Sequence, residues 1–210
     1  MICLGDNDAI RKLAACDLLG EALQLLGTQD RDVRVLPTAR YFFSNRNNRQ
    51  YIEDSCRAAT LARIDAFLGV APVCQLAVEP LDLAALNVRG IDAGERIFFA
   101  VTDLNCRIVT GDKTCLRALS DAARKGGRVA TVHARWQGRI VWFDQILLTL
   151  AQNQNELVEK MWQGCACDGA LLDIFVNGSQ TPVSHVIQVL ESRVAQVHRQ
   201  TNGLLLNLKS

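Results

Sequence analysis

The sequence has almost no excess of charge, no long uncharged hydrophobic run and no basic leader at its start. The formal net charge is +1, so the charge of the whole chain does not indicate a nucleic-acid partner, and only local clusters can. No uncharged apolar stretch approaches the roughly 20 residues of a membrane-spanning helix. The segment from Met1 to Asp6 lacks the basic and apolar regions of a signal peptide. We therefore expect a soluble, cytoplasmic protein with no membrane partner.

Cysteine is not scarce, but its distribution argues against disulfides. The 8 Cys residues are scattered through apolar context in a chain of 210 residues, which is long enough to bury a core without covalent staples. We expect buried free thiols in a reducing compartment. Cys165 and Cys167 form a tight pair, but this pair lacks the second half of a zinc site.

Short apolar runs alternate with segments of helical periodicity along the first part of the chain. The pattern predicts strands at 1–4, 33–36, 107–110 and 129–132, and an edge strand at 139–143. It predicts helices at 9–26, 52–68, 81–88, 92–101 and 116–123, with a loop or irregular helix end at 40–51. This alternation indicates an α/β fold, with helices on the faces of a parallel sheet.

The last third of the chain has a different, mainly helical character. After the expected edge strand, the periodicity predicts long helices at 144–162 and 181–201. We therefore divide the chain into a main domain, 1–138, and a helical C-terminal extension, 139–210, packed on it.

Acidic residues stand where the expected strands end and where one helix begins. Asp6 follows the first strand, Asp112 follows the strand at 107–110, and Asp92 and Glu95 form a capping-box pattern. Ligands of parallel sheets bind at the carboxyl ends of the strands. Phosphodiester hydrolysis needs divalent cations that offset negative charge and activate water, and such cations prefer oxygen ligands. Acids that converge on one such edge would meet this need.

These segments resemble the carboxylate set of the PIN-domain nuclease family, over approximately residues 1–135. Asp6 resembles the family's first acid, Gly94-Glu95 its helix-opening Gly-Glu, and Thr110-Gly111-Asp112 its strand-end Thr-x-Asp. The resemblance implies a three-layer α/β/α PIN-like domain and an endoribonuclease, often a toxin, that depends on Mg²⁺ or Mn²⁺. It further implies that Asp6, Glu95 and Asp112 hold the metal, and that Thr110 supports Asp112.

The chain departs from the family pattern after the second strand. PIN proteins usually carry a Glu there, whereas the stretch 37–43 contains no acid, and Glu53 and Asp54 come later. An alternative is therefore a catalytically degenerate PIN-like module that binds RNA or a protein partner. A phosphoacceptor regulatory domain is a third class, but Asp54 and Asp65 fall in helical context rather than at a strand end.

Each candidate acid also has a purely structural interpretation. Asp6 and Asp8 suit turns, Glu95 suits a capping pair with Asp92, and Asp112 suits the start of a β-turn. Two further residues stay open on the same grounds: Asp103, expected on the same helix face as Glu95, and Asn7, a turn residue or a support for a metal-bound water.

Basic residues cluster near these acids and again in the 40–51 segment. Basic groups track a phosphate backbone and aromatic rings stack on unpaired bases, so we expect single-stranded RNA as a partner. Charge runs are also typical of a solvated face, and both interpretations stay open. An antitoxin or other protein partner, or a second copy of the chain, are further expected partners. The expected substrate contacts are Lys113, Arg117, Arg40 and Arg46.

Overall fold

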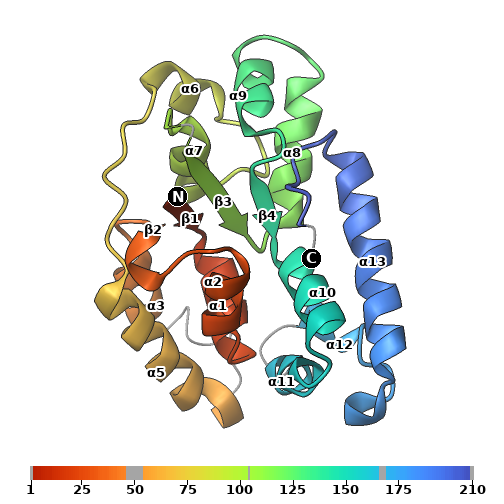
Figure 1. The fold of residues 1–210 in the computed structure, drawn as a ribbon. Helices are drawn as coiled ribbons and strands as arrows, with labels where there is room; N and C mark the ends of the chain where they lie inside the picture. The colour runs from red at the N-terminus through yellow and green to blue at the C-terminus, as the bar shows by residue number, and fades with distance from the viewer. Residues whose placement is uncertain (1, 46–53, 104, 166–168, 209–210) are drawn as a thin grey trace.

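The computed structural model describes residues 2–45, 54–103, 105–165 and 169–208. Within this part of the chain a four-stranded, parallel sheet has the order β2-β1-β3-β4 (Figure 1). Its strands are β1 (Ile2–Gly5), β2 (Val33–Val35), β3 (Cys106–Thr110) and β4 (Ile140–Trp142). The predicted α/β class with a parallel sheet is confirmed.

Helices flank the sheet and connect its strands (Figure 1). Helix α1 packs against α5 and α10, and α8 packs against α9 and α13. Before β3 the helical elements are α1 (Asn7–Ala15), α2 (Leu19–Leu25), η1 (Asp30–Asp32), α3 (Ala39–Ser44), α5 (Asp54–Val70), α6 (Pro80–Ala85) and α7 (Ala93–Ala100). After β3 they are α8 (Lys113–Ala123), α9 (Arg128–Trp136), α10 (Phe143–Asn153), α11 (Leu157–Gly164), α12 (Gly169–Leu172), η3 (Gly178–Gln180) and α13 (Val183–Gln200).

The strand order places a switch point between β1 and β3. From β1 the chain moves outward to β2, and then returns to the other side of β1 to form β3. Gly5 pairs with Val109 across this boundary, so Asp6 and Thr110 leave the sheet at the same level. In open parallel sheets the connecting helices diverge at such a point and leave a crevice at the carboxyl ends of the strands.

Both outer edges of the sheet carry further backbone pairing. Beside β2, Val35 accepts a hydrogen bond from Cys74 N–H at 2.7 Å and donates one to the Pro72 carbonyl at 3.1 Å. Beside β4, Ile140 accepts a hydrogen bond from Leu206 N–H at 2.7 Å and donates one to the Leu204 carbonyl at 3.2 Å. The segments 72–74 and 204–206 therefore line the two edge strands.

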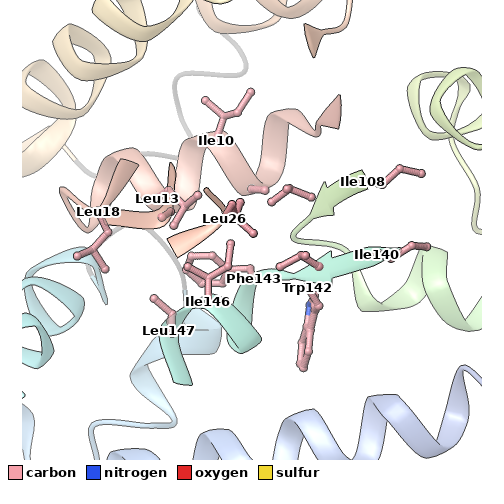
Figure 2. Close-up of a cluster of buried hydrophobic side chains, with 14 of the residues drawn as sticks. Ile10, Leu13, Leu18, Leu26, Ile108, Ile140, Trp142, Phe143, Ile146 and Leu147 are labelled. Carbon is pink, nitrogen blue, oxygen red and sulfur yellow. The ribbon is translucent and has the colours of Figure 1, made fainter. Parts of the chain in front are cut away.

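The apolar core joins the sheet to the helices on its flanks. Figure 2 shows buried side chains of α1, β3, β4 and α10, with Ile108 pointing away from Ile10, Phe143 and Ile146. These four side chains are at most 3% exposed. Burial of aliphatic and aromatic side chains of this size contributes about 1.5–3 kcal/mol each.

The helix predicted at 9–26 is two helices, and this prediction was wrong in its continuity. Asp17 has φ +54, and Leu18 N–H bonds to the Leu13 carbonyl at 2.9 Å. A left-handed residue after the last turn is a common helix stop. The chain therefore changes direction at Asp17, and Leu18 stays fully buried.

The strand predicted at 129–132 is instead the helix α9. A run of four apolar or small residues is too short to distinguish the periodicity of a helix from that of a strand. In the structure Val132, His133 and Trp136 are the buried positions of α9, which is a helical spacing.

Three other predicted helix boundaries also differ. The segment 144–162 divides into α10 and α11, because Gln154 takes an extended conformation with φ −144° and ψ 87°. Helix α5 does not stop at Gly69 but continues to Val70. A Cβ added at Gly69 would contact no other atom. Helix α6 begins at Pro80, a residue suited to the first helical position.

The boundary between 138 and 139 stays a prediction, although β4 lies beyond it and pairs with β3. None of the described helices is both long and apolar enough to cross a membrane. Cysteines 16, 56, 74, 106, 115 and 165 are free thiols, as expected, but Cys56 and Cys74 are only half-buried. Cys167 lies outside the described residues.

Candidate functional site

Asp6 directs its carboxylate across the sheet rather than into its own helix. It occupies the N-cap position of α1, yet its side chain makes no capping hydrogen bond. Its Oδ2 instead accepts hydrogen bonds from Thr110 Oγ1 at 3.1 Å and from Gly111 N–H at 3.4 Å. Burial raises the pKa of Asp6 to about 6, and the nearby Asp8 charge adds to this effect. A simple turn residue would need neither the cross-strand contacts nor this burial.

Thr110 and Asp112 form the second part of the site at the end of β3. The Thr110 hydroxyl donates to Asp6 and accepts from Asp112 N–H at 3.1 Å. Asp112 Oδ1 accepts from Thr114 N–H at 2.6 Å and Cys115 N–H at 3.3 Å, which caps α8. One oxygen of Asp112 thus fixes the helix start, while the half-buried carboxylate stays at the strand end.

Glu95 forms the capping box predicted for α7 and is also buried. Glu95 Oε2 accepts from Asp92 N–H, Asp92 Oδ1 accepts from Glu95 N–H, and both distances are 2.8 Å. The side chain is 8% exposed. Burial raises the pKa of Glu95 to about 8, and the charges of Asp92 and Asp112 act in the same direction. The structural interpretation of Glu95 is therefore correct, and the residue also interacts electrostatically with Asp112.

The three predicted metal ligands all interact electrostatically with the thiol of Cys115. This buried thiol hydrogen bonds to Glu95. Burial raises its pKa well above the ordinary value, and the charges of Glu95, Asp112 and Asp6 each raise it further. The structure therefore brings together side chains that are 89 and 17 positions apart in sequence, counted from Asp6 to Glu95 and from Glu95 to Asp112.

Lys12 lies in the site, although it was not among the residues expected there. Its Nζ is 2.7 Å from Asp8 Oδ2, 3.2 Å from the Gly111 carbonyl and 5.6 Å from the centre of the Phe143 ring. Burial alone would raise the pKa of Asp8, but Lys12 and Arg11 outweigh it and hold that pKa below the ordinary value. Asp8 is therefore ionised and pairs with Arg11 and Lys12 of α1. The i,i+4 spacing of Asp8 and Lys12 in the sequence is the pattern that could have indicated this pair.

Asp144 is a further acid at this edge that the sequence reasoning missed. It is the second residue of α10, directly after β4, and is 6% exposed. Arg193 of α13 lies 3.5 Å from its Oδ2. The strand-end rule that selected Asp6 and Asp112 would have found Asp144, had it been applied to the edge strand.

The donor chemistry at this edge consists of oxygen ligands. Within the described ranges, no group of three or more His, Cys, Asp or Glu residues is placed so that it could hold a metal ion. The buried Oδ1 of Asn7 has no hydrogen-bond partner in the same part of the chain. Carboxylates with an unused amide oxygen suit a hard cation that keeps several of its waters, as Mg²⁺ does.

The three predicted substrate contacts that the structure describes lie in different places. Lys113 is exposed and lines a recess together with Asp8 and Asp112. Arg117 lies on the next turn of α8 and lines a separate hollow of about 520 Å³ with Arg89 and Lys125. Thr114 belongs to both hollows, so they adjoin.

Arg40 does not join this site. Arg40 donates to the Leu68 carbonyl at 2.8 Å and thereby ties α3 to α5. Arg46 and Glu53 lie outside the described residues. Part of the predicted basic cluster is structural as well, because Arg128 and Arg135 each bond to the buried Asp82 at 2.5 Å.

The remaining acidic candidates do not reach the strand ends. Asp103 follows the end of α7 and accepts a hydrogen bond from Asn105 N–H at 2.8 Å. Because Asp103 lies beyond the last residue of α7, the prediction that it shares a helix face with Glu95 was wrong. Asp103 also precedes β3, whereas Asp112 follows this strand. Asp54 and Asp65 both belong to α5, in agreement with their exclusion as phosphoacceptors.

Comparison of the chain with protein-family models, curated proteins and solved structures gives no match.

Proposed function

We propose that this chain is a PIN-like, metal-dependent endoribonuclease that cleaves single-stranded RNA. The observation that supports the proposal is that Asp6 and Asp112 follow the neighbouring strands β1 and β3, and that the charges of Asp6, Glu95 and Asp112 all act on the buried Cys115 thiol. Two of the three acids have raised pKa values, which is common where carboxylates do chemistry. The proposal includes the three-layer α/β/α arrangement of the PIN fold.

In this proposal Asp6, Glu95 and Asp112 hold Mg²⁺ or Mn²⁺, and the Asn7 amide oxygen supports a bound water. The cation supplies charge that offsets the phosphodiester and activates water for attack. The Thr110 hydroxyl holds the Asp6 carboxylate in place through its 3.1 Å hydrogen bond. The first turn of α8 fixes Asp112 in the same way.

The two adjoining hollows give the RNA a path. Lys113 flanks the acids, and Arg117, Arg89 and Lys125 continue the positive charge along the neighbouring hollow. Basic side chains in such a row neutralise successive phosphates of a strand.

Amide variants test the proposal without removing the structural hydrogen bonds. Asn is a good N-cap and Gln suits a capping box, so Asp112→Asn and Glu95→Gln should fold normally. We expect each to lower Mn²⁺-dependent cleavage of a fluorescent single-stranded RNA by about 100-fold or more, as loss of ligand groups at metal sites does. Asp65→Asn, at an exposed position of α5, is the matched control and should cleave normally. Equal cleavage by all three variants would contradict the assignment.

A second candidate is a catalytically degenerate module that binds RNA or a protein partner, such as an antitoxin. The absence of an acid in 37–43 favours it. RNA binding in EDTA, with no cleavage by the wild type when Mn²⁺ is added, would support this candidate over the first.

A further inference from the structure

A recess of about 190 Å³ opens at the carboxyl ends of β1, β3 and β4. Asp8, Asp112 and Asp144 contribute its acids, and Lys12, Lys113 and Arg193 contribute its cations. At about 30 Å³ for each water in the liquid, the volume equals roughly six waters. The recess therefore accommodates one small group of a ligand rather than a peptide or a helix.

Trp142 gives this recess an unused hydrogen-bond donor. The residue is 4% exposed and lines the recess. No group in the described ranges accepts a hydrogen bond from its buried indole Nε1. Figure 2 shows the indole leaving the apolar cluster toward the α13 ribbon, and Arg193 of α13 lines the same recess.

The contrast with Trp136 shows that this fold can satisfy a buried indole. Trp136 is 1% exposed, and its Nε1 donates to the Phe99 carbonyl at 2.8 Å. A buried donor without a partner costs about 1–3 kcal/mol. Because an indole N–H can only donate, the partner missing at Trp142 is an acceptor.

The start of α10 indicates that this acceptor is anionic. The three acids and three cations of the recess balance one another, so the charge of the recess itself does not exclude an anion. The first two residues of α10, Phe143 and Asp144, also line the recess. The N-terminus of a helix of this length favours a negative ligand through its unpaired N–H groups and its dipole.

We infer that the recess binds a phosphate group of a nucleotide or of an RNA strand, which accepts a hydrogen bond from Trp142 Nε1. Lys113 and Arg193 line the same recess and supply positive charge to this phosphate. The inference rests on the proposed function for the identity of the strand, because it makes Trp142 the residue that positions a phosphate next to the acids. The binding of a phosphate itself does not require cleavage.

The three Trp residues of the chain permit a direct test by NMR. Trp142→Phe identifies the Trp142 indole resonance in a ¹⁵N spectrum of the wild type. With Mn²⁺ replaced by diamagnetic Mg²⁺, the probes are inorganic phosphate, a ribonucleoside 5′-monophosphate, a short single-stranded RNA and the unphosphorylated nucleoside. We expect a saturable shift of this resonance with the first three probes and none with the nucleoside. A response to inorganic phosphate and the nucleoside monophosphate, but not to RNA, would assign the recess to free nucleotides. A response to RNA at a lower concentration than to the monophosphate would assign it to a strand.

Two results would overturn the inference. One is an indole resonance that stays fixed while the phosphates bind elsewhere, and the other is an equal shift with the nucleoside. Trp142→Phe should weaken nucleotide binding about tenfold, which corresponds to one hydrogen bond to a charged acceptor. Trp136→Phe is the matched control: it should lower stability and leave nucleotide affinity unchanged. If it instead weakens binding as much as Trp142→Phe, the effect is structural and the inference fails.

The test separates this inference from the proposed function. Phosphate binding at Trp142 without RNA cleavage would refute the nuclease and keep the subsite. The opposite outcome would keep the nuclease and refute the subsite. It consists of cleavage that depends on Asp112, an indole resonance that does not move, and an unchanged KM in Trp142→Phe.

Discussion

Thr110 Oγ1 lies 3.1 Å from Asp6 Oδ2, so the hydroxyl at the end of one central strand holds the carboxylate at the end of its neighbour. The same hydroxyl accepts the Asp112 N–H. A single side chain thus connects the two acids that follow β1 and β3, and its loss should affect both.

Thr110→Val should lower stability and activity together. The valine keeps the shape but removes both hydrogen bonds, which we expect to cost about 1–2 kcal/mol in the free energy of unfolding. Asp6 also loses a bond that favours its ionised form, so its pKa should rise above about 6. Chemical denaturation and titration by NMR measure the two effects.

Thr60→Val is the control for this change. Thr60 is fully buried, and its hydroxyl has no partner among the residues described. Its replacement should be neutral or stabilising, since it removes an unsatisfied group. A cost equal to that of Thr110→Val would show that the hydroxyl contacts at the strand ends have no special role.

The raised pKa values of Asp6 and Glu95 predict that, without a divalent cation, stability falls as pH rises. Each carboxyl binds its proton more tightly in the folded than in the unfolded chain. The loss should therefore extend from the ordinary pKa values, 3.8 and 4.5, up to about 6 for Asp6 and about 8 for Glu95. Thermal denaturation in EDTA between pH 5 and pH 8 should show Tm decreasing by several degrees.

Glu95→Gln isolates the larger part of this effect. The amide keeps the capping box but does not titrate, so the slope of Tm between pH 6 and pH 8 should flatten. Saturating Mg²⁺ should also flatten the wild-type slope, because a cation stabilises the ionised carboxyls. An unchanged slope in the variant would mean that Glu95 does not titrate in this range.

Gly111→Ala should displace Asp8 from Lys12. A Cβ at Gly111 would overlap the Asp8 carboxylate and press on the backbone of Ala9. We expect a loss of about 1–3 kcal/mol, as for other over-packed sites, and a raised pKa of Asp8. Gly69→Ala is the contrasting variant, because a Cβ there meets nothing in α5. It should be neutral or stabilising by up to ~1 kcal/mol.

Lys125→Ala should reduce the salt dependence of RNA binding. Lys125 lines the hollow that adjoins the acids, and each lost phosphate contact lowers the slope of log K against log salt by about 0.7 for a single strand. Arg124→Ala is the neighbouring control, since Arg124 is tied to Asp121 and to the Gln200 carbonyl. Equal slopes in both variants would place the RNA elsewhere.

The sequence was informative where a local rule decides the structure. The capping box of Glu95 and the strand ends at Asp6 and Asp112 follow from short-range patterns, and the structure has them as predicted. The apolar run at 129–132 had no such rule, because four residues fit a helix as well as a strand. The break at Asp17 was equally hidden, since an isolated left-handed Asp leaves no clear signal in composition.

The lateral order of the strands could not be read from the chain. Alternation predicts a parallel sheet, but it does not say that β3 returns to the far side of β1, and this return produces the crevice beside Asp6 and Thr110. Lys12 and Trp142 were missed for the same reason. Each carries no motif, and its role depends on helices that meet only in three dimensions.

The pairing of 72–74 beside β2 and of 204–206 beside β4 has a consequence for assembly. Exposed strand edges invite pairing with another chain, and here the two lateral strands already have backbone neighbours. Recruitment of an antitoxin strand or of a second protomer by sheet extension is therefore disfavoured. Pairing of a further strand directly against Val35 of β2 or Ile140 of β4 would first have to displace these two segments.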